Sequence, residues 1–223
     1  MSRVQCLVVA KAPVPGLAKT RLGAKIGMAA AADLAAAALL DTLDACELAF
    51  TTGRRHVALI GALTEAARGP EIAGRLRGWS VFEQVGHGFP TRLAAAHAEV
   101  GRRTGGATMQ IGMDTPQVTA NLLCAVVAGL DDHDAVLGTA PDGGWWALAL
   151  REPRDAAVLA GVPTSTPDTA AQTREALLDR GLAVGGAPGL RDVDTVDDAR
   201  AVAAEAPDGR FAAAWQHWAQ VSA

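Results

Sequence analysis

Apolar runs alternate with amphipathic segments along most of the chain. Val4 to Ala10 is a continuous apolar run that ends at a loop rich in proline and glycine. Such a run is typical of a strand buried on both faces of a parallel sheet. Ala29 to Leu48 is rich in alanine and leucine, which are strong helix formers, and predicts a long helix.

The same alternation continues to the C-terminus. Further strands are predicted at 56–62, 80–84, 107–112, 135–137 and 145–150 and near Ala183, and further helices at 65–77, 91–103, 119–130, 169–180, 196–206 and 211–221. Gly185 to Gly189 is predicted to be a loop. Strands that alternate with helices predict an α/β fold with three layers, in which helices cover both faces of a mostly parallel sheet. Without repeats or a linker, residues 1–223 are expected to form a single domain.

Composition narrows the class of protein. Half of the 223 residues are hydrophobic, the net charge is -4, and no run of lysine or arginine suggests a nucleic-acid partner. We expect a cytoplasmic protein without a membrane span, because the N-terminal apolar stretch is too short for a signal peptide and the alanine-rich stretch contains Asp33. Cys6, Cys46 and Cys124 are too far apart in sequence for a CxxC pair, which favours a reducing compartment. We expect each cysteine to be a small side chain of the core.

The first segment with candidate chemistry is KAPVPGLAKTRL, from Lys11 to Leu22. It places three cations on a loop shaped by proline and Gly16 between a strand and a helix. Ligands of α/β folds gather beyond the carboxyl ends of strands, where Lys11, Lys19 and Arg21 could neutralise phosphates. A P-loop is excluded, since that motif needs glycine before the lysine. A solvated basic turn remains the alternative.

The second segment is Gly112-Met-Asp114-Thr-Pro116, at the end of a predicted strand. A carboxylate in this position projects into the cleft, and Mg²⁺ takes one or two protein carboxylates together with phosphates and water. The alternative is that Asp114 caps the next helix or turn.

The third segment is Asp142-Gly143-Gly144-Trp145-Trp146. Two glycines let the backbone turn tightly and approach a ligand, and the tryptophans could wall a sugar or a base, or simply pack. Asp-Gly is also a hairpin signal, and a hairpin is compatible with a pocket.

The fourth segment is Asp192-Val-Asp194-Thr195. On an extended segment Asp192 and Asp194 point the same way, and two such carboxylates repel each other unless a cation lies between them. The alternative is that Asp194 or Thr195 caps the following helix, which leaves Asp192 without a role.

Taken in this order, the segments resemble a family of transferases known as arsenosugar-type or radical-SAM-associated glycosyltransferases, with the type A glycosyltransferase fold. The family pattern is matched nearly throughout the chain, at Lys11 to Leu22, Gln84, Arg92-Leu93, Gly112 to Pro116, Asp142 to Gly144, Ser165-Thr166 and Asp192 to Thr195. The chain departs from the family pattern at three places. Trp145-Trp146 replace two tyrosines, Thr139 replaces a proline and Thr164 replaces a tryptophan. More distantly, the segments are similar to guanylyltransferases.

The resemblance implies a fold like that of nucleotide-diphospho-sugar transferases and assigns roles to the four segments. Donor phosphates would lie on Lys11, Gly16, Lys19 and Arg21. Mg²⁺ or Mn²⁺ would be held by Asp114 with Asp192 and Asp194. Asp142 would contact the acceptor, as a base, in a pocket formed by Gly143, Gly144, Trp145, Trp146 and Thr166.

These roles predict a metal-dependent transferase with a nucleotide-activated donor, most simply a glycosyltransferase with a nucleotide sugar and a small-molecule acceptor. One alternative is nucleotidyl transfer from a nucleoside triphosphate to a small phosphorylated or carboxylated acceptor, which releases pyrophosphate. The other is a nucleotide-binding module without turnover. The sequence leaves the donor, the acceptor and the oligomeric state open.

Overall fold

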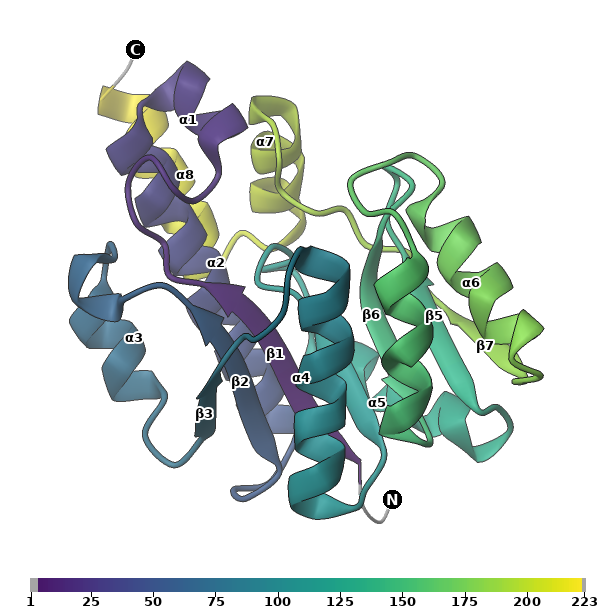
Figure 1. Cartoon of the computed structure of the whole chain (residues 1–223). Coiled ribbons are helices and arrows are strands. Elements are labelled where there is room, and N and C mark those ends of the chain that lie inside the picture. The colour runs from purple at the N-terminus through teal and green to yellow at the C-terminus, as the bar shows by residue number, and fades with distance from the viewer. Residues whose placement is uncertain (1–3, 222–223) are drawn as a thin grey trace.

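A computed structural model describes residues 4–221 and contains a seven-stranded sheet in the order β3-β2-β1-β4-β6-β5-β7 (Figure 1). The strands are β1 (Gln5–Lys11), β2 (Arg55–Ile60), β3 (Ser80–Glu83), β4 (Thr108–Ile111), β5 (Ala135–Thr139), β6 (Trp145–Leu150) and β7 (Val184–Ala187). All neighbours are parallel except that β6 runs antiparallel to both β4 and β5. The predicted α/β fold with a mostly parallel sheet is confirmed.

Helices cover both faces of this sheet, as Figure 1 shows. The α-helices are α1 (Thr20–Ile26), α2 (Met28–Ala49), α3 (Gly69–Arg75), α4 (Phe89–Thr104), α5 (Ala120–Ala128), α6 (Thr169–Asp179), α7 (Val196–Glu205) and α8 (Arg210–Val221). The described residues also form the 3₁₀ helices η1 (Leu63–Glu65), η2 (Gly129–Asp131) and η3 (Pro153–Gly161).

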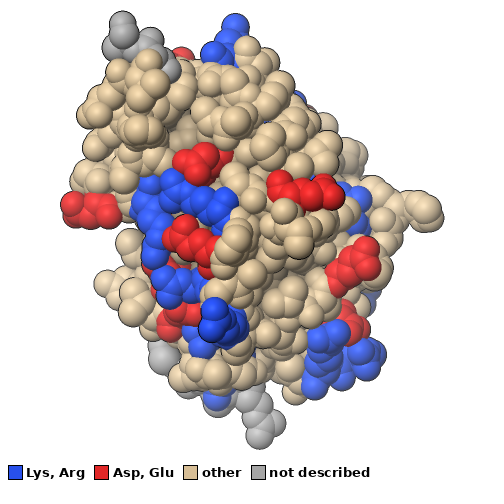
Figure 2. Space-filling view, turned by 90° about the vertical axis from the view of Figure 1, so that its left-hand side faces the viewer, with Lys and Arg blue, Asp and Glu red and all other residues tan. Residues whose placement is uncertain are grey.

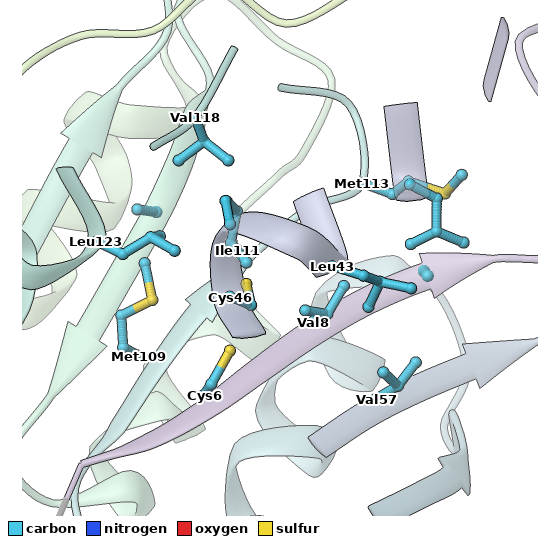
Figure 3. Packing of buried hydrophobic residues seen from close by; sticks show 14 of the residues in the cluster. Cys6, Val8, Leu43, Cys46, Val57, Met109, Ile111, Met113, Val118 and Leu123 are labelled. Atoms are coloured by element: carbon cyan, nitrogen blue, oxygen red, sulfur yellow. The ribbon is translucent and has the colours of Figure 1, made fainter. Parts of the chain in front are cut away.

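The central strand β1 contributes to two cores because successive side chains point to opposite faces of a sheet. Cys6 and Val8 pack with Leu43 and Cys46 of α2, as Figure 3 shows. Leu7 and Val9 belong to a second core on the other face, together with side chains of α4, η3 and α6. The uninterrupted apolar run of β1 therefore reflects burial on both sides, as the sequence pattern predicts.

Some elements differ from the prediction. The loop after β1 ends in the separate helix α1, and Gly27, with φ of 91°, divides it from α2. The helix predicted at 65–77 is split into η1 and α3, and η3 was not predicted. The loop predicted at Gly185 to Gly189 is wrong for its first residues, which belong to β7. Glycine has low strand propensity, but β5 pairs with this segment, and a side chain at Gly185 would meet the His133 ring at 2.8 Å.

The order of the strands creates a switch point between β1 and β4. The chain continues from β1 to β2 on one side, whereas β6 and β5 lie on the other side of β4. The two strands are parallel, so their carboxyl ends at Lys11 and Ile111 lie at the same edge of the sheet. Such crevices are where ligands bind in open α/β sheets.

The C-terminal helix α8 is fixed to α2 by ionic contacts. Arg210 contacts Asp41, Asp44 and Glu71, and its backbone N–H donates to Asp41. Figure 2 shows the side of the molecule that carries α3 in Figure 1, where acidic and basic side chains are interleaved. On this face the charges therefore pair with one another and do not form a patch of one sign. None of the helices in the described part of the chain is long and apolar enough to cross a membrane.

Candidate active site

The loop between β1 and α1 directs the Lys19 side chain inward. Lys19 has φ 48° and ψ 46°, and its carbonyl accepts a hydrogen bond from Gly23 in the first turn of α1. The left-handed conformation costs a residue other than glycine roughly 1–2 kcal/mol. The surrounding contacts must therefore favour this conformation strongly.

The Lys19 ammonium lies between two carboxylates. Its Nζ is 2.9 Å from Asp114 Oδ2 and 2.7 Å from Asp194 Oδ1, and only 11% of its side chain is exposed. Burial acts to lower the pKa of Lys19, but attraction by Asp114 and Asp194 outweighs it, so the pKa is raised. The predicted loop cation and two of the predicted acids are therefore brought together in one charged cluster.

Backbone contacts explain how Asp194 reaches this cluster. The Val193 N–H donates to the Asp114 carbonyl at 3.0 Å, and Gln117 Nε2 donates to the Arg191 carbonyl at 2.7 Å. Val193 is buried, whereas Asp192 and Asp194 both line a cavity, as expected for alternating side chains.

Helix capping does not account for the two aspartates. Thr195 is the N-cap of α7 and forms a reciprocal capping box with Asp198. The alternative that Asp194 caps this helix is therefore wrong, whereas capping by Thr195 is confirmed.

Two cavities meet at this cluster. The first, which we call the loop cavity, has a volume of about 250 Å³ and is lined by Lys11, Leu17, Ala18, Lys19, Thr20, Arg21, Ala35, Met113, Asp114 and Asp194. The second, which we call the Trp145 cavity, has a volume of about 490 Å³ and is lined by Val9, Arg21, Phe89, Leu93, Gln110, Gly112, Asp114, Thr115, Ala140, Asp142, Gly144, Trp145, Trp146, Thr164, Ser165, Thr166, Pro167, Thr169, Asp192 and Asp194. Arg21, Asp114 and Asp194 line both. Gly16 lines neither cavity.

The turn between β5 and β6 brings Asp142 to the Trp145 cavity. Asp142 Oδ1 accepts a hydrogen bond from Gly144 N at 2.8 Å, and Ala140 N donates to the Gly144 carbonyl. Gly143 has φ 89°, and an added Cβ would lie 1.8 Å from the Pro167 carbonyl oxygen, so only glycine fits. The predicted hairpin turn is formed, and Asp142 and Gly144, but not Gly143, line the cavity.

The two tryptophans play different structural parts. Trp145 is half-buried in the cavity wall, whereas Trp146 is 3% exposed and belongs to the core. Both indole N–H groups have partners, Thr173 Oγ1 for Trp145 and the Pro188 carbonyl for Trp146. In this arrangement the Trp145 indole can offer a ligand apolar contact but no free N–H donor.

The segment from Thr164 to Thr166 also lines the Trp145 cavity. Thr166 N donates to Thr169 Oγ1, and Ser165 has φ 62°. Ser165 and Phe89 line the cavity although the sequence analysis did not assign them a site role. Phe89, 45% exposed at the start of α4, carries a signal in the sequence as an aromatic residue directly after a glycine-rich loop.

The carboxyl of Asp192 in the Trp145 cavity has a raised pKa. Burial, followed by repulsion from Asp142 and Asp194, raises its pKa to about 6. Within residues 4–221 no three Asp, Glu, His or Cys side chains lie close enough to hold a metal ion. The predicted arrangement of Asp114, Asp192 and Asp194 around one cation is therefore not formed here.

Two of these acids nevertheless suit a divalent cation. Asp114 Oδ1 is buried and has no hydrogen-bond partner among the described residues. Asp114 and Asp194 already share one positive charge, that of Lys19. Two carboxylates are also the number that Mg²⁺ usually takes alongside substrate phosphates.

The fold belongs to a known structural class. A solved structure of a proposed nucleotide-diphospho-sugar transferase from Desulfovibrio desulfuricans G20 matches with a TM-score of 0.83 at 24% identity, covering 97% of this chain and 95% of that one. The fold is therefore that of nucleotide-diphospho-sugar transferases. The chain belongs to the family described as an uncharacterized protein conserved in bacteria (DUF2064), which matches residues 42–166.

More distant solved structures share this fold. Rv0371C of Mycobacterium tuberculosis H37Rv, in complex with manganese, matches with a TM-score of 0.53 at 19% identity, covering 90% of this chain and 98% of that one. A cytidylyltransferase from Leptospira borgpetersenii matches with a TM-score of 0.53 at 13% identity, covering 89% of this chain and 84% of that one. No curated protein matches the chain. The structural neighbours thus include both nucleotide-sugar transferases and cytidylyltransferases.

Proposed function

We propose that this protein is a metal-dependent transferase that moves a glycosyl group from a nucleotide sugar to a small acceptor. The observation that carries the proposal is the junction of two cavities at Asp114 and Asp194. One cavity carries three cations, and the other has an aromatic wall and several hydroxyl groups. A donor and an acceptor can therefore meet beside the charged cluster.

The loop cavity suits the diphosphate of the donor. Lys11, Lys19 and Arg21 line it, and cations with backbone N–H groups at the start of a helix neutralise phosphates. Mg²⁺ or Mn²⁺ on Asp114 and Asp194 would stabilise the charge that develops on the leaving diphosphate.

The transfer needs an acceptor nucleophile and a base in the Trp145 cavity. The acceptor oxygen forms a bond to the anomeric carbon while the bond from that carbon to the phosphate oxygen breaks, which releases a nucleoside diphosphate. Asp142 lines the cavity and is exposed, so its carboxylate can take the proton of the acceptor hydroxyl. The aromatic face of Trp145 would hold a sugar ring by apolar contact.

A thermal-shift screen of nucleotides and nucleotide sugars, with Mn²⁺ or with a chelator, tests this function. A ligand that binds only the folded protein stabilises it by about 2.7 kcal/mol at one hundred times its dissociation constant. We expect one nucleoside diphosphate class to stabilise the protein in Mn²⁺ and to lose most of this effect with the chelator. If the chelator makes no difference, the metal claim is wrong, and if no nucleotide stabilises the protein, the donor claim is wrong.

Nucleotidyl transfer is the competing reaction, since cytidylyltransferases share the fold. It would release pyrophosphate from a nucleoside triphosphate, whereas glycosyl transfer releases a nucleoside diphosphate. Product analysis with the donor found in the screen separates the two reactions.

Replacing Arg21 with alanine is expected to weaken nucleotide binding by about 1–2 kcal/mol, near the lower end for a lost charged hydrogen bond. The Arg21 side chain is 76% exposed and lies 3.6 Å from Asp194, so stability should hardly change. Calorimetric titration with the selected nucleotide measures the effect. Arg200→Ala is the matched control, because Arg200 is 66% exposed and pairs with Asp197 away from both cavities. Equal affinities of the two variants would remove Arg21 from the site.

A further inference from the structure

The two cavities differ in the charge of their walls. The loop cavity is lined by three cations and two carboxylates, whereas the Trp145 cavity is lined by four carboxylates and one cation, Arg21. Lys19 contacts Asp114 and Asp194, the two carboxylates that the cavities share. Asp142 and Asp192 line only the Trp145 cavity, and among the described residues neither forms a salt bridge, although Lys19 and Arg191 attract Asp192 at longer range. A divalent cation on Asp114 and Asp194 would leave these two charges facing the acceptor.

The other polar groups of the Trp145 cavity are mostly hydroxyls. Thr115 is 2% exposed, and its Oγ1 has no hydrogen-bond partner in the described part of the chain. Thr164, Ser165 and Thr166 add further hydroxyls to the lining. Hydroxyls and carboxylates can accept hydrogen bonds from a hydroxyl or an amine, and a buried polar atom that lacks a partner is costly unless a ligand supplies one.

We propose that the Trp145 cavity selects an acceptor that bears hydroxyl or amino groups and carries no phosphate or carboxylate. This inference rests on the proposed function and narrows its acceptor. An anionic group in the cavity would face Asp142 and Asp192 at close range, and like charges across an interface oppose binding. The phosphorylated or carboxylated acceptor of the nucleotidyl-transfer alternative does not fit these walls.

Thiol labelling measures this charge selectivity without a known acceptor. Ser165→Cys, which replaces one oxygen with sulfur, places a thiol on the cavity wall in a Cys124→Ser background, since Cys6 and Cys46 are fully buried. The rates of reaction with a cationic and an anionic methanethiosulfonate reagent are compared. Gln216→Cys, on the exposed face of α8, provides the reference.

We expect the ratio of cationic to anionic rates at Ser165→Cys to exceed the reference ratio by about tenfold or more, the lower end of electrostatic focusing in a charged cleft. Adding Asp142→Asn and Asp192→Asn should bring the ratio close to the reference, and it should leave the ratio at Gln216→Cys unchanged. A ratio at Ser165→Cys equal to the reference overturns the proposal. Thr164→Cys repeats the measurement from the same wall if the first variant does not fold.

Protection from labelling by a matched set of sugars tests whether the cavity applies the same charge selectivity to ligands. With Mn²⁺ and the nucleotide from the screen present, glucose or glucosamine should slow labelling more than glucose 6-phosphate does. Stronger protection by glucose 6-phosphate would overturn the proposal. The nucleotide screen itself reports separately on the donor, so failure of the proposed function is distinguished from failure of the acceptor class.

Discussion

Replacing Lys19 with methionine is expected to lower the free energy of unfolding by about 3 kcal/mol when a chelator is present. Removing one partner of a buried ion pair costs about 3–5 kcal/mol, and the lower end applies because the side chains of Asp114 and Asp194 are 37% and 39% exposed. Methionine keeps most of the length and apolar volume of the lysine stem, so the lost charge dominates the effect. Denaturant unfolding measures it.

Mn²⁺ should then stabilise the Lys19→Met variant more than it stabilises the wild-type protein. In the wild type the ammonium already neutralises part of the charge of Asp114 and Asp194, and in the variant only the metal can neutralise these two carboxylates. Lys25→Met is the matched control, since Lys25 is exposed on the same helix α1. If Lys19→Met and Lys25→Met have equal stability, and Mn²⁺ does not distinguish them, Lys19 is not the counter-ion of the two acids.

His97 is expected to make the protein less stable in acid, by about 3 kcal/mol between pH 7 and pH 4. The imidazole is fully buried on α4, with Nδ1 2.6 Å from Thr108 Oγ1. Burial lowers the pKa of His97 from 6.5 to about 4, although the neighbouring Gln110 side chain acts in the other direction. One pKa unit corresponds to about 1.4 kcal/mol, so the change from 6.5 to about 4 is worth about 3 kcal/mol.

The loss of stability in acid follows from the different pKa values of His97 in the folded and unfolded chain. The unfolded chain takes up the proton as the pH falls below about 6.5, whereas the folded chain resists protonation until about pH 4. The stability contributed by neutral His97 is therefore complete above pH 6.5 and is lost progressively down to pH 4. Asp192 acts in the opposite sense, because its folded pKa is raised to about 6.

Comparison with a single variant isolates His97 from these other groups. His97→Gln keeps a polar side chain beside Thr108 but has no titration in this range, so its unfolding free energy should fall less between pH 7 and pH 4. Unfolding in urea at several pH values gives both curves. Parallel curves for the wild type and the variant would show that His97 does not carry the effect.

Much of the local structure follows from short-range patterns. The run from Val4 to Ala10 marks β1 to within one residue at each end, and 145–150 coincides with β6. Burial and helix propensity act over neighbouring residues, so these elements are readable from the sequence. The strand predicted near Ala183 extends further along the chain as β7, into the predicted loop, because pairing with the distant strand β5 outweighs the low strand propensity of Gly185 and Gly186.

The candidate site likewise has some features that the sequence predicts and others that depend on the tertiary structure. The sequence by itself determined which residues carry charge and which loops follow strands, and hence that cations and acids would gather at one edge of the sheet. The tertiary structure alone decided that Lys19 lies between Asp114 and Asp194 and that Trp145, more than Trp146, faces the cavity. These outcomes depend on contacts between distant segments, such as the hydrogen bond from Val193 N to the Asp114 carbonyl. No local pattern encodes such a contact, because it exists only once the strands are ordered and the backbone of the C-terminal segment is held against the loop that follows β4.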